Sequence, residues 1–322
     1  MTLPRVSVYM LSYQHAAYIR ESIDSILEQD YPNLRIVIGD DASTDGTQDI
    51  LRDYAARYPG LFTLLLAEKN QGITRNANQV FRACDGEFLA HTSGDDAWLP
   101  GKLHKQVTWM ADNPDAVMCY TNAEHIDAQG KRIRLHHESR RNPFREGGMD
   151  VFLQSILFFP ACSVMVRRTA APSYGFDERL PWNSDWLYLA EIAHKGRTGY
   201  IPETLARYRV HGESAMRNVD AVLADAIRAC DILGAKYPEH RLQIERLRGE
   251  FIEGSALQHL KAGRSGRAAS LLREAYAVNP HGDSYLNAPA KAALAFLSRT
   301  ELLEPVYRLY AALTAPGRSF RL

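Results

Sequence analysis

The sequence predicts an α/β fold with a doubly wound sheet, followed by a helical region. Up to residue 91, short apolar segments rich in β-branched residues alternate with segments whose apolar residues recur at helical spacing. This alternation is typical of βαβ units, in which helical crossovers join parallel strands. From about residue 215 helical periodicity dominates, which predicts an appended group of helices.

The predicted elements follow in a regular order. We expect a strand at residues 6–11 and a helix at residues 18–29, where Ile19, Ile23 and Ile26 share one face. Residues 1–214 are assigned to an α/β domain and residues 215–322 to a helical region. The alternation continues with strands at residues 34–38, 61–66 and 87–91 and helices at residues 47–58 and 74–83.

The composition is that of an ordinary globular protein and does not favour nucleic acid as a partner. The 322 residues include 38 Lys and Arg and 38 Asp and Glu, so the formal net charge is zero. The four cysteines form no C-x-x-C pair, and no charged segment followed by an apolar core opens the sequence. We expect buried free thiols and a cytoplasmic protein. Residues 215–322 hold 15 basic and 11 acidic residues, an excess compatible with peripheral contact with an anionic membrane.

Three polar loops follow predicted strands. Ser12 and Tyr13 come after the first strand, residues 40–46 after the second, and residues 92–96 after the fourth. In doubly wound sheets, ligands bind outside the carboxyl ends of the strands. We therefore expect these loops to converge on a binding site.

Two of these loops carry paired carboxylates. Asp95 and Asp96 would repel each other without a nearby positive charge, and Mg²⁺ or Mn²⁺ would supply one. The alternative is a turn with solvated acids. Asp40 and Asp41 favour the metal interpretation, because capping and turn chemistry accounts for Asp45 but leaves these two unexplained.

Three isolated residues are further candidates. Asp185 opens a predicted helix between Trp182 and Trp186, and apolar neighbours would raise its pKa toward that of a general base. An acid in the first turn of a helix is also ordinary. His211 follows a predicted strand and is either structural or a nitrogen ligand for a metal. Arg75 opens another predicted helix, where it would meet phosphate oxygens or face solvent.

Six short motifs occur in a fixed order between residues 12 and 211. They are Ser12-Tyr13, Asp40-Asp41-Ala42-Ser43-Thr44-Asp45-Gly46-Thr47, Asn70-Gln71-Gly72 with Arg75-Asn76, Ser93-Gly94-Asp95-Asp96, Ser184-Asp185-Trp186 and Tyr208-Arg209-Val210-His211. In this order they resemble the motifs of the family 2 inverting glycosyltransferases, whose GT-A fold is a Rossmann-like, doubly wound mixed sheet. The resemblance covers residues 6–214.

The resemblance implies a role for each matching residue. Asp95 would be the main carboxylate on Mn²⁺ or Mg²⁺ and His211 a second ligand, with Asp96 either a further metal residue or a neighbour of the site. Asp185 would be the catalytic base. Many family members have an aspartate where this chain has Ser93, and a hydroxyl there can bond a ribose or a metal-bound water but adds no charge. The remaining implied nucleotide-binding residues are Ser12, Tyr13, Asp40, Asp41 and Arg75.

The implied activity is transfer of a sugar from a nucleoside diphosphate donor to an acceptor hydroxyl in bacterial surface-polysaccharide synthesis. A carboxylate at Asp41 suits the N3–H of uracil or thymine, which favours UDP or dTDP over GDP. The acceptor would be a glycan or a lipid-linked glycan. The C-terminal helices would support a homo-oligomer or dock the enzyme at the inner face of the membrane.

Two other functions are weighed against this one. A sugar-phosphate nucleotidyltransferase needs a glycine-rich loop after the first strand, and residues 12–15 are Ser-Tyr-Gln-His. A nucleotide-sugar binding relative without activity is left open by Ser93. Residues 120–175 contain nothing diagnostic of the sugar, and the basic stretch at residues 131–145 is either an acceptor loop or a solvated connection.

Overall fold

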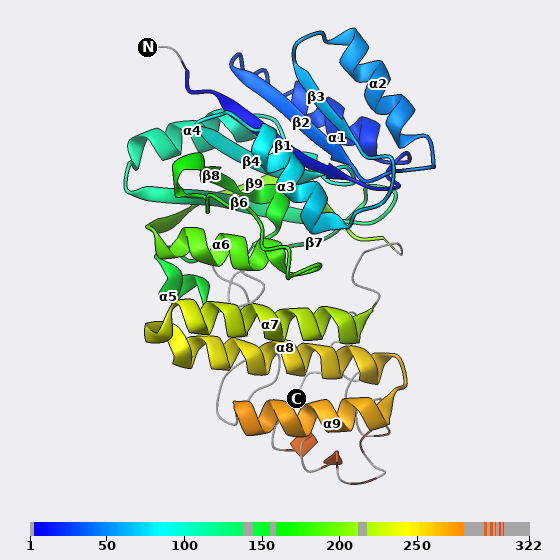
Figure 1. Cartoon of the computed structure of the whole chain (residues 1–322), viewed down its shortest axis with the longest axis vertical. Helices are drawn as coiled ribbons and strands as arrows, with labels where there is room; N and C mark the ends of the chain where they lie inside the picture. Colours follow the sequence, from blue (N-terminus) through cyan, green and yellow to red (C-terminus); the bar gives the residue numbers. More distant parts are fainter. Residues whose placement is uncertain are drawn as a thin grey trace, which may run out of the picture. The chain divides into compact units, whose positions relative to one another are not determined.

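The computed structural model describes residues 3–137, 144–154, 159–211 and 218–279, with a few positions between 293 and 305. Part of the basic stretch at residues 131–145 lies outside them. The chain separates into two compact units (Figure 1). The first unit comprises Met1–Phe152 and Leu157–Ser214, and the second comprises Leu153–Ile156 and Ala215–Leu322.

The first half of the first unit alternates strands and helices, as the sequence predicts. β1 lies between β2 and β4, β3 pairs with β2, and all these pairings are parallel. Every residue of β1 except Leu11 is buried, as expected for a strand covered on both faces. The elements are β1 (Val6–Ser12), α1 (Ile19–Leu27), β2 (Leu34–Asp40), α2 (Thr47–Arg57), β3 (Phe62–Leu66), α3 (Ile73–Ala83) and β4 (Phe88–Ser93).

The second half makes the sheet mixed. The strand order is β3-β2-β1-β4-β8-β6-β9-β5, with β7 paired to β6. β8 runs antiparallel to β4 and β6, and β5 antiparallel to β9, so the predicted mixed sheet is confirmed. The elements are β5 (Ala97–Trp98), α4 (Lys102–Asp112), β6 (Ala116–Ile126), β7 (Arg132–Leu135), α5 (Met149–Phe152), β8 (Met165–Arg167), α6 (Ser184–His194) and β9 (Arg197–Arg209).

Helix α3 packs closely on β2 because β2 has a glycine at the contact. A Cβ atom at Gly39 would lie 2.2 Å from Asn76 Oδ1 and 2.5 Å from Val80 Cγ2. Without that atom, Asn76 Nδ2 donates a hydrogen bond to the Gly39 carbonyl oxygen over 2.9 Å. This contact holds the first turns of α3 beside the carboxyl ends of the parallel strands, where the polar loops lie.

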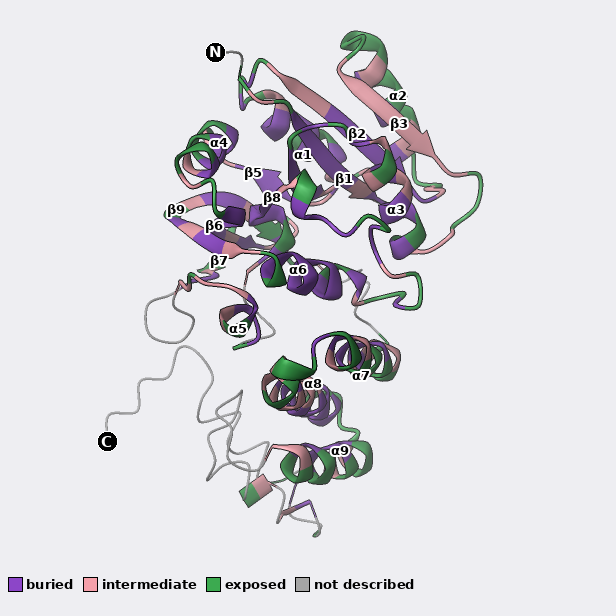
Figure 2. Cartoon of the chain, turned by 60° about the vertical axis from the view of Figure 1, so that its left-hand side comes forward, coloured by how far each residue is buried: buried purple, intermediate pink, exposed green. Residues whose placement is uncertain are grey.

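The second unit contains the predicted helical region, which is confirmed. Helix α8 (Arg241–Lys261) packs against both α7 (Val219–Lys236) and α9 (Ser265–Val278). Leu223, Ile252 and Leu271 belong to a hydrophobic core that is separate from the core of the sheet. Figure 2 shows the exposed sides of these helices in green. Within the described part of the chain, no helix combines the length and the apolar character that crossing a bilayer requires.

Candidate active site

The polar loops meet at the carboxyl ends of the parallel strands. In the strand register Ser12 lies opposite Asp40 on β2, and Leu11 lies opposite Ser93 on β4. The backbone N–H of Asp41 also donates to the Ser12 carbonyl oxygen over 3.0 Å. Three segments far apart in the sequence therefore share one edge of the sheet.

The acidic pair after β2 organises the loops themselves. Asp40 is fully buried and accepts bonds from Ser43 N and Oγ, at 2.9 and 2.6 Å, and from Gln48 Nε2 at 2.9 Å. Donors of its own loop and of α2 surround its carboxylate, and its expected contact with a nucleotide stays a prediction. Asp41 accepts two backbone N–H groups of the segment before α3, at 2.7 and 2.9 Å. Asp41 thus links the loop after β2 to the start of α3.

The loop after β4 brings Asp95 against two histidines. His211 Nε2 lies 2.9 Å from Asp95 Oδ2, and His15 Nε2 lies 3.8 Å from the same oxygen. These side chains are largely buried and come from the loop after β1, the loop after β4 and the residues after β9. The sequence predicted Asp95 and His211 but missed His15, although His15 stands in the polar loop after the first strand.

The two adjacent acids differ in their electrostatics. Burial would raise the pKa of the Asp95 carboxyl, but the charge of His15 and hydrogen bonds from Ser93 and His211 more than offset it and hold that pKa below its usual value. Burial, and then the charge of Asp95, raise the pKa of Asp96 well above its usual value. The two pKa values are thus shifted in opposite directions, and the negative charge of the pair is favoured on Asp95 over Asp96.

Arg209 holds the acidic loop in place. The sequence motif that contains Arg209 did not indicate this role. Its backbone N–H donates to Asp96 Oδ1 over 2.9 Å, and its Nε donates to the Asp95 carbonyl oxygen over 2.8 Å. The same guanidinium reaches Glu21 on α1 and the Asp127 carbonyl oxygen. Asp96 therefore anchors this loop, and its place in the metal site stays a prediction.

Gly94 lets the acidic loop approach the loop after β1. A Cβ atom there would lie 2.6 Å from His15 Nδ1, 2.7 Å from Ile19 Cδ1 and 3.3 Å from Ser12 Oγ. Both His15 Nδ1 and Ser12 Oγ are buried and have no hydrogen-bond partner within the described residues. Such groups are uncommon in folded proteins and indicate a ligand or a water that completes them.

A cavity of about 160 Å³ opens beside the acidic loop. Ser93 lines it from the end of β4, Asp96 from the loop that follows, and Asp185 from the first turn of α6. The structure therefore brings Asp185 to the acidic loop, which is about ninety residues earlier in the sequence. Aromatic rings form much of the remaining lining, from Tyr9, His91, Phe176 and Trp182.

Asp185 is exposed, which corrects the expectation that two tryptophans enclose it. Consecutive side chains on a helix point in different directions, so Trp186 turns into the protein, where it is 9% exposed, while Asp185 faces outward. Trp182 precedes the helix and is 38% exposed. Asp185 Oδ1 accepts the N–H of Trp186 over 2.8 Å, so one carboxylate oxygen is oriented by the helix.

Two predicted nucleotide-binding residues lie on the surface. The Arg75 side chain is 64% exposed, and its Nε lies 3.5 Å from Glu178 Oε2. Tyr13 is 46% exposed. Neither residue lines the cavity that contains Asp185.

A family model described as glycosyl transferase family 2 matches residues 7–175, which is more than half of the chain. The chain belongs to glycosyl transferase family 2. The match starts in β1 and runs past β8, so it includes Asp95 and Asp96 and ends before Asp185 and His211.

The alignments with relatives of this family 2 chain span only part of its length. An uncharacterized protein of Mycobacterium tuberculosis is 36% identical over 215 residues, which are 64% of this chain and 59% of the relative. The chain thus matches less than two thirds of that relative's length. TuaG of Bacillus subtilis, whose name assigns it provisionally to teichuronic acid biosynthesis as a glycosyltransferase, is 36% identical over 109 residues, 34% of this chain and 43% of TuaG.

Solved structures confirm the GT-A fold of the family 2 chain. Staphylococcus aureus TarS, residues 1–349 in complex with UDP-GlcNAc, superposes with a TM-score of 0.64 at 17% identity, over 98% of this chain and 93% of that one. The mannosyltransferase PcManGT of Pyrobaculum calidifontis, in complex with GDP-Man and Mn²⁺, superposes with a TM-score of 0.61 at 22% identity, over 98% of this chain and 85% of that one.

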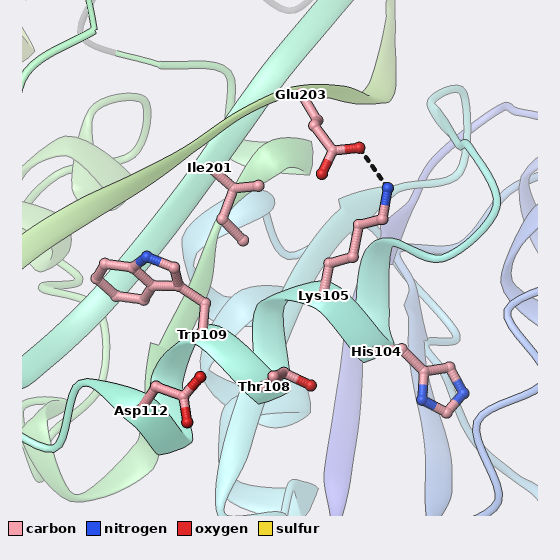
Figure 3. Close-up of a pocket in the computed structure, with 7 residues that line it drawn as sticks. All are labelled: His104, Lys105, Thr108, Trp109, Asp112, Ile201 and Glu203. Atoms are coloured by element: carbon pink, nitrogen blue, oxygen red, sulfur yellow. Dashed lines mark hydrogen bonds and ion pairs between the residues drawn. The ribbon is translucent and has the colours of Figure 1, made fainter.

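A second cavity of this family 2 chain lies between α4 and β9, away from the polar loops. Its volume is about 380 Å³, and Figure 3 shows Lys105 on α4 paired with Glu203 on β9 across it. The indole of Trp109 also lies against β9, where a Cβ atom at Gly199 would overlap the ring. The ion pair and the indole tie α4 to β9, so we interpret this cavity as part of the scaffold.

Proposed function

We propose that the chain is a metal-dependent, inverting glycosyltransferase. It would move a hexosyl group from a UDP or dTDP donor to a hydroxyl of a glycan or lipid-linked glycan during surface-polysaccharide synthesis. The observation that carries the proposal is the convergence of Asp95, His15 and His211 at the acidic loop, whose next residue, Asp96, lines the same cavity as Asp185. A relative named for teichuronic acid biosynthesis supports the class of acceptor.

The side chains around Asp95 suit Mn²⁺ or Mg²⁺. One carboxylate oxygen lies within 3.8 Å of two imidazole nitrogens, and a mixed oxygen and nitrogen set favours Mn²⁺ of the two ions. Ser93 is close enough to bond the Asp95 carboxylate and would hold it in orientation. When bound, the metal would act as a Lewis acid on the diphosphate leaving group. The Mn²⁺ in the PcManGT complex, which has the same fold, supports this assignment.

Asp185 would accept the proton of the acceptor hydroxyl. A base must lie within hydrogen-bond reach of the group that it deprotonates, and an exposed carboxylate at a cavity mouth is open to an acceptor arriving from solvent. The acceptor oxygen then attacks the anomeric carbon as the bond to the diphosphate breaks. A single displacement of this kind inverts the anomeric centre.

The nucleotide would lie over the loops after β1 and β2. Asp41 would accept the N3–H of a pyrimidine at a lone pair that the two backbone N–H groups before α3 leave unused. Ser12 and Tyr13 would contact the nucleotide. Arg75 would reach the diphosphate only after leaving Glu178. Because that ion pair is exposed and 3.5 Å long, exchanging Glu178 for a phosphate costs little free energy.

The proposed division of labour follows the sequence. Residues 1–214 would carry the reaction, and residues 215–322 would support a homo-oligomer or dock the enzyme near a membrane-borne acceptor. The net positive charge of the second segment, with 15 basic and 11 acidic residues, supports contact with an anionic surface at the inner face of the membrane.

A thermal-shift titration with UDP, dTDP and GDP, with and without Mn²⁺, tests the proposal. A ligand that binds only the folded chain raises the stability of that chain by mass action. Because the proposed metal contacts the diphosphate, UDP or dTDP should raise the melting temperature more with Mn²⁺ than without it. A response to GDP in place of UDP and dTDP would refute the base assignment. No response to any nucleotide would refute the donor class, and binding with no turnover of any donor would favour the inactive relative.

A further inference from the structure

An exposed tryptophan stands at the mouth of the cavity, three residues before the proposed base. Trp182 is 38% exposed and lines the same cavity as Asp185. Ile73, the first residue of α3, also lines this cavity and is 44% exposed. Large apolar side chains left exposed beside a polar site are a common sign of ligand contact.

The segment that carries Trp182 is fixed to α3 by one buried hydroxyl. Thr74 Oγ1 donates to the Leu180 carbonyl oxygen over 2.6 Å and lies 2.9 Å from Ser184 Oγ. Because the single proton of Thr74 goes to Leu180, the Ser184 hydroxyl donates to Thr74. All three residues are buried. The residues on both sides of Trp182 are therefore held, and the indole is presented on a rigid backbone next to Ile73.

The chemistry of this rim matches a pyranose ring. One face of a pyranose consists largely of C–H groups, which pack against an aromatic ring, while its edge carries hydroxyls that need acceptors. Trp182 and Ile73 supply the apolar surface, and Asp185 supplies a carboxylate acceptor within the same cavity. A linear polyol has no ring face to stack on the indole, and a purely apolar ligand has no hydroxyl to donate to the carboxylate.

We infer that Trp182 and Ile73 form the acceptor subsite, and that the acceptor presents its reacting hydroxyl on a pyranose ring stacked on Trp182. This inference rests on the proposed function, because it takes Asp185 to be the base that contacts the acceptor. Of the proposed nucleotide-binding residues, Ser93 lines the same cavity, whereas the side chains assigned to the base and the diphosphate, Asp41 and Arg75, do not. Trp182 is therefore assigned to acceptor binding, and nucleotide binding is measured beside it in the test.

Direct binding of simple sugars tests the inference without turnover. Saturation-transfer NMR would be run on the full chain with methyl pyranosides of glucose, galactose, mannose and N-acetylglucosamine, and with sorbitol as a ring-free polyol. The variants are Trp182→Ala, Trp182→Phe and Ile73→Ala. Tyr276→Ala in α9 is the matched control, because Tyr276 has the same 38% exposure as Trp182 but lies in the second unit.

At least one pyranoside should bind the wild type and sorbitol should not. Trp182→Ala should weaken pyranoside binding by about 10- to 100-fold, the usual cost of truncating a central tryptophan, and Trp182→Phe should keep most of the affinity. The inference is overturned if no pyranoside binds the wild type, or if Trp182→Ala binds as the wild type does. Binding of UDP with Mn²⁺, measured on the same samples, reports separately on the proposed function and should be equal in every variant.

Discussion

Asp95 and Asp96 are neighbours in sequence, but their surroundings give them different properties. Asp95 faces His15 and His211 at 3.8 and 2.9 Å, and its pKa is lowered. Asp96 is buried, accepts the backbone N–H of Arg209 and has a raised pKa. At this scale Asp96 anchors the acidic loop, and Asp95 presents its carboxylate to the two histidines.

Replacing each acid by its amide should separate these roles. Asp95→Asn should abolish the Mn²⁺-dependent part of UDP binding, because it removes the charge that two histidines face. Asp96→Asn should keep most of that binding, because the amide oxygen can still accept the backbone N–H of Arg209 and hold the loop. Isothermal titration of UDP at fixed Mn²⁺ measures both, with exposed Asp49→Asn on α2 as the control. Equal losses in the Asp95 and Asp96 variants would contradict the assignment.

Asp185→Asn should lower sugar transfer by about 10²–10⁴, the usual contribution of a general base. The amide keeps the shape and the bond from Trp186 N–H, but it cannot take a proton. UDP and Mn²⁺ binding should be unchanged. The anomeric proton coupling of the product should show inversion, and a retained anomer would refute the single-displacement mechanism.

At the scale of elements, α4 begins with a fully buried lysine. Lys102 Nζ donates to Gln106 Oε1 over 2.7 Å and lies 4.2 Å from the centre of the Trp98 ring. Burial lowers the pKa of Lys102 to about 7, and the thiols of Cys162 and Cys119 oppose this shift only in part. Folding with Lys102 protonated therefore carries a free-energy penalty for burying its charge at the start of α4.

This burial predicts a pH-dependent stability. Between about pH 7 and the ordinary lysine pKa near 10.4, the unfolded chain holds a proton that the folded chain has lost. The contribution of Lys102 to stability therefore rises with pH across this window and is lowest at and below pH 7. Lys102→Met lacks this term, so its melting temperature relative to the wild type should be highest at pH 6.5 and fall toward pH 10. A difference that is constant over this range would show that Lys102 is charged in the folded chain.

The sequence predicts some elements far better than others. Strands β1 to β4 carry continuous apolar segments, and the apolar residues of the helices between them recur at helical spacing. The local sequence pattern was therefore enough to predict these elements. β5 and β8 contain two and three residues, and both pair with strands far away in the sequence, which no local pattern reports. For the same reason the spacing of Asp95 and His211 did not indicate Arg209, whose role depends on where β9 lies.

The prediction that apolar side chains surround Asp185 was wrong, because residues that are neighbours in the sequence of a helix point in different directions. The pairing of Arg75 with Glu178 was likewise hidden, since the two residues are about a hundred positions apart. His15 lacked a signal of its own, and its contact with Asp95 arises only when the loops after β1 and β4 share an edge.

At the scale of the whole molecule, the two units have separate hydrophobic cores. A chain that ends at residue 218 should therefore still bind UDP with Mn²⁺, because every proposed ligand lies in residues 12–211. Titration calorimetry on the folded, monodisperse truncation checks this. Loss of binding in such a sample would show that the second unit takes part in the site.

The position of β9 has a consequence for the order in which the protein is made. This strand lies between β6 and β5, and it delivers Arg209 to a loop that is more than a hundred residues earlier. A ribosome extends the chain from its N-terminus, so β1 to β4 and the acidic loop emerge well before their anchor. Until Arg209 and His211 have left the exit tunnel, Asp96 lacks its N–H donor and Asp95 lacks its nearest imidazole. A nascent chain therefore cannot hold Asp95 and Asp96 in this arrangement until β9 and His211 have emerged.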